Sequence, residues 1–272
     1  MENADIPVVI LCGGMGTRLR EASEKLPKPL VDIGGKPILW HVMKSYEKYG
    51  FRRFILCLGY KSDLIKRYFL DYRAEVSDFT LQMGDLSRQN FHTSRRTEDW
   101  TVTFVETGLL SGTGARVRRI ERYLSESPRF MLTYGDGIGD VDLDQLLKVH
   151  EGSGRMGTVT AVHPNSRYGE MKVEPGSSLV TEFSEKPNNA EGWVSGGFFV
   201  FENAFVAAYL DDDPSLMLEQ RPLTALARER QLSVHRHEGF WMGMDTFRDW
   251  TELNSLWDSG AAPWKTWSDE PL

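Results

Sequence analysis

The sequence has little cysteine, no excess of positive charge and no long hydrophobic run, and each shortage excludes a class of protein. Its two cysteines, Cys12 and Cys57, lie far apart in apolar runs that are typical of buried strands. Two such thiols do not make the disulfide framework of a small secreted protein, so we expect a reducing, cytoplasmic environment.

The charge and the hydropathy of the chain exclude two kinds of partner. The formal net charge at pH 7 is -7, whereas generic nucleic-acid binding depends on clustered lysine and arginine. The first apolar run, around Val8–Leu11, is much shorter than the roughly 20 residues of a membrane-spanning helix, and no basic segment precedes it as in a secretory signal. We therefore expect no nucleic-acid partner, no membrane span and no signal peptide.

Short apolar runs alternate with amphipathic segments, such as 38–49 and 62–72, along the 272 residues. Strands that alternate with helices form βαβ units with a mostly parallel sheet, so the pattern predicts an α/β fold. We expect helices to begin near Ser62 or Asp63 and near Asp142 or Asp144, and the polar stretch 82–100 to be a solvated loop or arm. The predicted strands are Val8–Leu11, Phe54–Leu58, Val102–Val105, Phe130–Thr133, Gly157–Val162 and Gly197–Phe201.

Three glycines, Gly13, Gly14 and Gly16, follow the first predicted strand. Their spacing matches neither a P-loop nor a dinucleotide-binding turn. Successive backbone N–H groups in such a loop can nevertheless surround an anion, and glycine permits a close approach. Thr17 adds a hydroxyl, and Arg18 adds a charged fork suited to phosphate. An isolated glycine pair would be a plain tight turn, but this combination indicates an anion-binding loop.

Lys28 lies between two prolines a short distance after this loop. Prolines stiffen the backbone, so they would hold the lysine in one direction. The glycine loop, Arg18 and Lys28 together predict a triphosphate site.

Two aspartates could hold a metal ion beside such phosphates. Asp136, in Gly-Asp-Gly, follows the apolar run Phe130–Thr133 and would stand at the carboxyl end of a strand, where α/β sheets bind ligands. Asp245 precedes an amphipathic segment and could equally be a helix cap. If the two converge, their carboxylates could hold one or two Mg²⁺ ions.

Glu185 and Lys186, fixed by a following proline, could contact sugar hydroxyls and a second phosphate, although such a segment is also a common surface turn. The histidines offer no comparable site. His41 is interpreted as a helix-face residue, and His235 and His237 are too sparse for zinc.

Beyond these motifs, the chain resembles the sugar-1-phosphate nucleotidyltransferases, and among them the glucose-1-phosphate cytidylyltransferases. The resemblance runs almost end to end and includes VVILCGGMGTRLRE, LTYGDGIGDVD, FSEKP, GFWMGMDTFRDW and APWKTW. It implies one Rossmann-like nucleotidyltransferase domain over residues 1–272, with a mixed, mostly parallel sheet flanked by helices and a small β/α sugar-binding extension. Residues 1–140 would mainly bind the nucleotide, and residues 141–272 the sugar phosphate, with a C-terminal oligomerisation segment. It also implies Mg²⁺ dependence and a homo-oligomer.

The resemblance assigns roles by position. Arg18, Lys28 and Asp136 would be catalytic, and Asp136 and Asp245 would bind the metal. The nucleotide would contact Leu11, Gly13, Gly14, Gly16, Thr17, Arg18, Lys28, Thr113 and Arg116, and the sugar phosphate would contact Tyr168, Gly169, Glu170, Glu185, Lys186, Ser195 and Gly196.

The implied reaction converts CTP and a sugar 1-phosphate, α-D-glucose 1-phosphate above all, to a CDP-sugar and pyrophosphate. Four departures from the cytidylyltransferase pattern leave the base and the sugar open, because sites that hydrogen-bond a hydroxyl discriminate strongly. UTP, dTTP or GTP, or another sugar 1-phosphate, remain alternatives, as does a non-catalytic sugar-nucleotide sensor; an NAD-dependent oxidoreductase fails on the glycine spacing. The departures are Leu26 for a lysine or arginine, Ala115 for glycine, Ser195 for asparagine and Met242 for glutamine.

Overall fold

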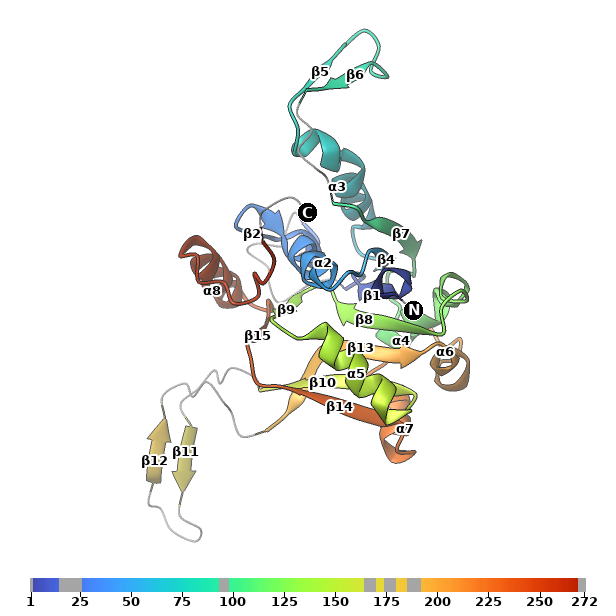
Figure 1. The fold of residues 1–272 in the computed structure, drawn as a ribbon, viewed down its shortest axis with the longest axis vertical. Coiled ribbons are helices and arrows are strands. Elements are labelled where there is room, and N and C mark those ends of the chain that lie inside the picture. Colours follow the sequence, from blue (N-terminus) through green and yellow to red (C-terminus); the bar gives the residue numbers. More distant parts are fainter. Residues whose placement is uncertain are drawn as a thin grey trace.

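The computed structural model of the protein describes residues 2–14, 26–92, 98–163, 170–173, 180–184 and 192–268, with only the backbone described at 170–173 and 180–184. Its centre is a seven-stranded sheet in the order β14-β10-β13-β8-β1-β4-β7 (Figure 1). The strands are β1 (Pro7–Leu11), β4 (Arg53–Leu58), β7 (Thr101–Glu106), β8 (Arg129–Tyr134), β10 (Gly157–Val162), β13 (Val194–Glu202) and β14 (Leu232–His237).

The sheet is mixed and mostly parallel, as the sequence predicts. β1 pairs in parallel with β4 and β8, β4 pairs in parallel with β7, and β10 pairs in parallel with β14. Only β13 runs against its neighbours in the main sheet, β8 and β10. All six predicted strands are present, within one to three residues at each end.

Both faces of the sheet are buried, which explains why the central strands are continuous apolar runs. Along β1, Val8 and Ile10 belong to one apolar cluster, whereas Val9 and Leu11 belong to a second cluster on the opposite face. The alternation follows from the two-residue period of a strand.

Helices cover the two faces. Side chains of α2, α3, α5 and α8 join the cluster around Val8, and those of α4, α6 and α7 join the cluster around Val9. The Asp142 carboxylate caps α5, as predicted, by accepting a hydrogen bond from the backbone N–H of Gln145. Helix α3 begins at Ser62, and the residue at its cap position is Lys61. The helices are α2 (Ile38–Lys48), α3 (Ser62–Glu75), α4 (Thr113–Arg119), α5 (Leu143–Ser153), α6 (Ala204–Tyr209), α7 (Arg221–Arg228) and α8 (Phe247–Asp258).

In the described part of the chain, four two-stranded ribbons accompany the sheet. The pair β5–β6 projects beyond the end of α3 (Figure 1), so part of the polar stretch 82–100 is an arm; residues 93–97 of it lie outside the described part. The pair β11–β12 stands apart from the sheet (Figure 1). The ribbons are β2 (Asp32–Ile33) with β3 (Lys36–Pro37), β5 (Phe79–Leu81) with β6 (Gln89–Phe91), β9 (Gly137–Gly139) with β15 (Trp241–Gly243), and β11 (Glu170–Val173) with β12 (Val180–Ser184).

The C-terminal segment docks against the first long helix. Trp264 is fully buried, and its indole N–H donates to Nδ1 of His41 on α2 across 3.4 Å. Nε2 of the same imidazole lies 2.9 Å from the carbonyl oxygen of Ile33. His41 is therefore a buried packing residue, and burial lowers its pKa to about 4.

No helix in the described ranges is long and apolar enough to cross a membrane.

Candidate active site

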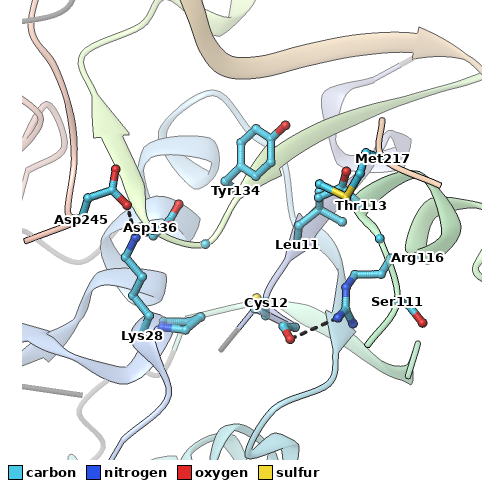
Figure 2. A pocket seen from close by; sticks show the side chains of 15 residues that line it. Leu11, Cys12, Lys28, Ser111, Thr113, Arg116, Tyr134, Asp136, Met217 and Asp245 are labelled. Carbon is cyan, nitrogen blue, oxygen red and sulfur yellow. Dashed lines mark hydrogen bonds and ion pairs between the residues drawn. The ribbon is translucent and has the colours of Figure 1, made fainter. Parts of the chain in front are cut away.

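A cavity of about 370 Å³ opens at the carboxyl ends of β1 and β8 (Figure 2). The chain leaves β1 toward β4 and β7 on one side and returns to β8 on the other, so the two strands flank a topological switch point. Open α/β sheets bind ligands at such points. The cavity therefore lies where the fold alone would place a substrate.

The end of β1 supplies one wall of the cavity. Leu11, Cys12, Gly13 and Gly14 line it. Among the described residues, a Cβ atom added at Gly14 would meet nothing within 4 Å, so none of them covers the backbone at this point of the cavity. The other predicted residues of this loop, Gly16, Thr17 and Arg18, lie outside the described residues.

Three charged side chains meet at the cavity wall. The ammonium nitrogen of Lys28 lies 2.7 Å from Oδ2 of Asp136 and 2.7 Å from Oδ1 of Asp245 (Figure 2). The lysine side chain is 11% exposed, and the carboxylates are 37% and 42% exposed. Two aspartates that are distant in sequence thus converge on one cation.

Local structure explains why these side chains meet. Lys28 begins a short 3₁₀ helix, Lys28–Leu30, directly after Pro27, which fixes the entry of the chain. Asp136 lies in the turn between β8 and β9. Asp245 follows β15, which pairs with β9, so the ribbon brings the two aspartates together. The cap of α8 is Thr246, in a capping box with Asp249, and Asp245 is not the cap.

The lysine in this cluster is charged. Burial lowers the pKa of Lys28, but the charge and hydrogen bond of Asp136, followed by those of Asp245, outweigh burial and raise it above its usual value. The carboxylates in turn suit a small divalent cation, because their oxygens already converge on a single cationic atom. Within the described residues no group of three or more potential metal ligands exists. A pair of carboxylates fits Mg²⁺, which takes one or two of them together with phosphates and water.

Arg116 reaches the cavity from α4 and is 4% exposed. Its guanidinium donates to the carbonyl oxygens of Gly13, Leu58 and Leu109 and to the hydroxyl of Thr107. In the described residues its hydrogen bonds thus go to the end of β4 and to the segments that follow β1 and β7.

A further network closes the cavity between β8 and α4, and of its residues only Thr113 was predicted from the sequence. The hydroxyls of Tyr134 and Thr113 both donate to the carboxylate of Glu219, and Thr113 also accepts from the backbone N–H of Leu218. Thr113 and Tyr134 line the cavity, together with Met217. Tyr134 stands two residues before Asp136 and could have been proposed for that reason, whereas Glu219 lies in no recognisable motif.

The sugar-phosphate residues are described only in part. Tyr168, Gly169, Glu185 and Lys186 lie outside the described residues, and Glu170 is placed only as the first residue of β11. Ser195 is exposed and Gly196 is buried near the start of β13, where the indole N–H of Trp241 donates to the Gly196 carbonyl across 2.8 Å.

Two of the four sequence departures are in the core. Met242 is 7% exposed and packs in the apolar cluster around Val8, and Ala115 is 3% exposed in the opposite cluster. Leu26 is 38% exposed. The Met242 side chain therefore packs among apolar side chains of the core.

Comparison with known proteins identifies the family to which the chain belongs. The family described as "Nucleotidyl transferase" matches residues 7–260. A glucose-1-phosphate cytidylyltransferase of Salmonella typhi is 44% identical over 259 residues, which cover 95% of this chain and 98% of the relative. A probable glucose-1-phosphate cytidylyltransferase of Bacillus subtilis is 43% identical, with 95% and 99% covered.

Among solved structures, HddC from Yersinia pseudotuberculosis complexed with GMP-PN superimposes with a TM-score of 0.65. It is 22% identical, and the match covers 93% of this chain and 99% of that one, so this likeness concerns the fold alone. The match across nearly the whole chain and the high identity to curated relatives agree with the sheet and the cavity described above. The chain belongs to the nucleotidyl transferase family.

Proposed function

We propose that this protein transfers a cytidylyl group from CTP to α-D-glucose 1-phosphate, which gives CDP-glucose and pyrophosphate. The observation that carries the proposal is the meeting of Lys28, Asp136 and Asp245 at a cavity that Gly13 and Gly14 also line. The choice of base and sugar is supported by relatives named as glucose-1-phosphate cytidylyltransferases at 43% and 44% identity.

The reaction needs charge neutralisation more than it needs a base, because a phosphate oxygen is already an anion. Two unit charges about 4 Å apart repel by roughly 1 kcal/mol in water and by more in a drier site. Lys28 is held at the cavity wall in its charged form, so it can offset the repulsion between the two substrates. Arg18 and Lys186, predicted from sequence, would add to this effect.

Asp136 and Asp245 are the residues that would hold Mg²⁺. When bound, the metal would neutralise phosphate charge and orient an in-line displacement at the α-phosphorus. The chain itself positions the substrates. The nucleotide would lie along Leu11–Gly14 and Thr113, and the sugar phosphate on the side of Ser195 and Gly196.

The test is a pyrophosphate-release screen of CTP, UTP, dTTP and GTP against a panel of sugar 1-phosphates in the presence of Mg²⁺. We expect the highest kcat/KM with CTP and α-D-glucose 1-phosphate. Turnover with another nucleotide but not with CTP would overturn the cytidylyl assignment, and turnover with no pair would overturn the enzymatic function, as a sugar-nucleotide sensor would behave.

We also propose that the protein is a cytoplasmic homo-oligomer. Both cysteines are buried and free, which suits a reducing compartment. Exposed apolar side chains on α3 and on the turn of the β5–β6 arm, among them Leu70, Met83 and Leu86, would suit contact with a second copy. Sedimentation velocity across a concentration series tests the assembly, and a monomer at every concentration would contradict it.

A further inference from the structure

We infer that Arg116 is a positioning residue, which holds the nucleotide-binding loop in shape without contacting the nucleotide. This differs from the direct contact that the family resemblance implies. It rests on the proposed function only for the identity of the ligand, because the geometry concerns the protein alone.

The hydrogen bonds of Arg116 leave little of the guanidinium for a ligand. A guanidinium has five N–H donors and no acceptor. Nη1 donates to the Leu58 carbonyl across 3.0 Å and to the Thr107 hydroxyl across 2.8 Å. Nη2 donates to the Gly13 carbonyl across 3.1 Å and to the Leu109 carbonyl across 3.3 Å. These four bonds match the four terminal N–H donors and leave the Nε–H, so a phosphate that approached Nη1 or Nη2 would have to displace a protein acceptor.

The acceptors belong to three different segments. Gly13 follows β1, Leu58 ends β4, and Thr107 and Leu109 follow β7. These strands are parallel neighbours in the sheet, so their carboxyl ends lie side by side. A single planar side chain from α4 therefore joins three strand ends, and the segment after β1 that it contacts lines the cavity.

The glycines of these segments make room for the guanidinium. A Cβ atom at Gly13 would lie 2.0 Å from Nη1 of Arg116, and one at Gly59 would lie 2.8 Å from the same atom. At Gly14 the same addition would meet no atom of the described residues within 4 Å. Arg116 therefore requires glycine at position 13, whereas no described residue imposes this at position 14.

The charge of Arg116 also supports a positioning role. Within the part of the chain that the structure describes, it makes no ion pair with a carboxylate, and its four acceptors are neutral. A buried guanidinium remains charged in proteins. An anion bound over Gly13 and Gly14 would be attracted by this positive charge without contacting it, because the loop lies between them. Arg116 would thus both shape the loop and favour a polyphosphate there.

The test compares Arg116→Lys and Arg116→Gln with Arg118→Gln, a matched change on the same helix at an arginine that pairs with Glu121 on the surface. Amide hydrogen exchange is followed in the ligand-free protein, and KM is measured for CTP and for glucose 1-phosphate. We expect at least tenfold faster exchange at residues 12–14 and 107–110 in both Arg116 variants. An ammonium cannot reproduce a planar fork, so lysine should not restore protection.

In kinetics we expect the KM for CTP to rise at least tenfold, while the KM for glucose 1-phosphate changes less than threefold. Exchange in Arg116→Lys equal to that of the wild type would overturn the inference and favour a direct contact. Because the exchange readout needs no substrate, it stands even if the protein turns over no nucleotide. If neither Arg116 variant folds, Gly13→Ala, which leaves the arginine in place, should accelerate exchange in the same segments, and Gly14→Ala should not.

Discussion

Asp136 and Asp245 each place a carboxylate oxygen 2.7 Å from the same nitrogen atom, the Nζ of Lys28. The relationship joins a turn after β8, a turn before α8 and a 3₁₀ helix near the start of the chain. It gives the cavity a cation that belongs to the protein and a pair of carboxylates that suits a second, exogenous cation.

The first prediction concerns the carboxylates. Asp136→Asn keeps the size of the side chain but removes a charge, so Mg²⁺ should bind more weakly and kcat should fall by about 100-fold or more. Calorimetric titration with Mn²⁺ measures binding without turnover. Asp142→Asn, at the cap of α5, is the matched control, because asparagine caps helices as well as aspartate does. Normal kcat in Asp136→Asn would contradict the metal assignment.

The second prediction concerns the shared lysine. Lys28→Met leaves two carboxylates facing each other, so the metal-free protein should lose stability. Breaking a buried pair costs about 3–5 kcal/mol and losing a surface pair about 0–1 kcal/mol. Since these carboxylates are 37% and 42% exposed, we expect about 1–2 kcal/mol.

Denaturant unfolding with and without MgCl₂ checks this expectation. Mg²⁺ should stabilise Lys28→Met more than the wild type, because the metal can replace the lost cation. Lys66→Met, which removes an exposed pair with Glu106, is the control and should respond to Mg²⁺ like the wild type. An equal Mg²⁺ effect in Lys28→Met would show that the lysine and the metal are independent.

How much of this site follows from sequence can be seen in the same residues. The strand that ends before Asp136 is a clear apolar run, and the proline after Lys28 indicates a rigid segment. Asp136 and Lys28 could therefore both be identified from sequence. The approach of Asp245 to Asp136 depends on the β9–β15 ribbon, which pairs residues more than a hundred positions apart and leaves no local pattern. From sequence Asp245 could equally be the cap of α8. In the structure Thr246 is the cap, because it forms a capping box with Asp249.

The fold shows the same division. Parallel strands buried on both faces are continuous apolar runs and are easy to recognise. The antiparallel direction of β13 depends on pairing with β8 and β10, which only the assembled sheet determines. Arg116 illustrates the limit for side chains, because its partners are mostly backbone carbonyls that any residue carries.

The third prediction concerns the wall between β8 and α4. Glu219→Ala removes the acceptor shared by the hydroxyls of Tyr134 and Thr113. Both side chains would lose their fixed orientation, so we expect a 3- to 10-fold rise in the KM for CTP, about 1 kcal/mol. Glu229→Ala removes a similar carboxylate from Tyr209 at an exposed site, and it should leave KM unchanged. An unaltered KM in Glu219→Ala would remove this network from substrate binding.

The fourth prediction concerns pH. Burial, with smaller effects from the charges of Lys265 and Lys36, lowers the pKa of His41 to about 4, against about 6.5 in the unfolded chain. The unfolded state then binds more protons between these values, so stability is full above pH 6.5 and falls as the pH drops toward 4, by about 3 kcal/mol in total.

Unfolding free energies across pH 4 to 7 test this sign. His41→Gln keeps a donor and an acceptor but does not titrate, so its profile should be flatter than that of the wild type. His92→Gln, at an exposed histidine, is the matched control. Parallel profiles for His41→Gln and the wild type would mean that acid destabilisation arises elsewhere in the protein.

The burial of Trp264 against α2 has a consequence for biosynthesis. Helix α2 lies near the start of the chain. The side of this helix that carries His41 is covered by a segment that leaves the ribosome some two hundred residues later. Until then, this face of the nascent chain is apolar and uncovered, and the first half cannot complete its core. The core around α2 can therefore be completed only late in translation. Until then, the exposed α2 surface is the part of the nascent chain that molecular chaperones would cover.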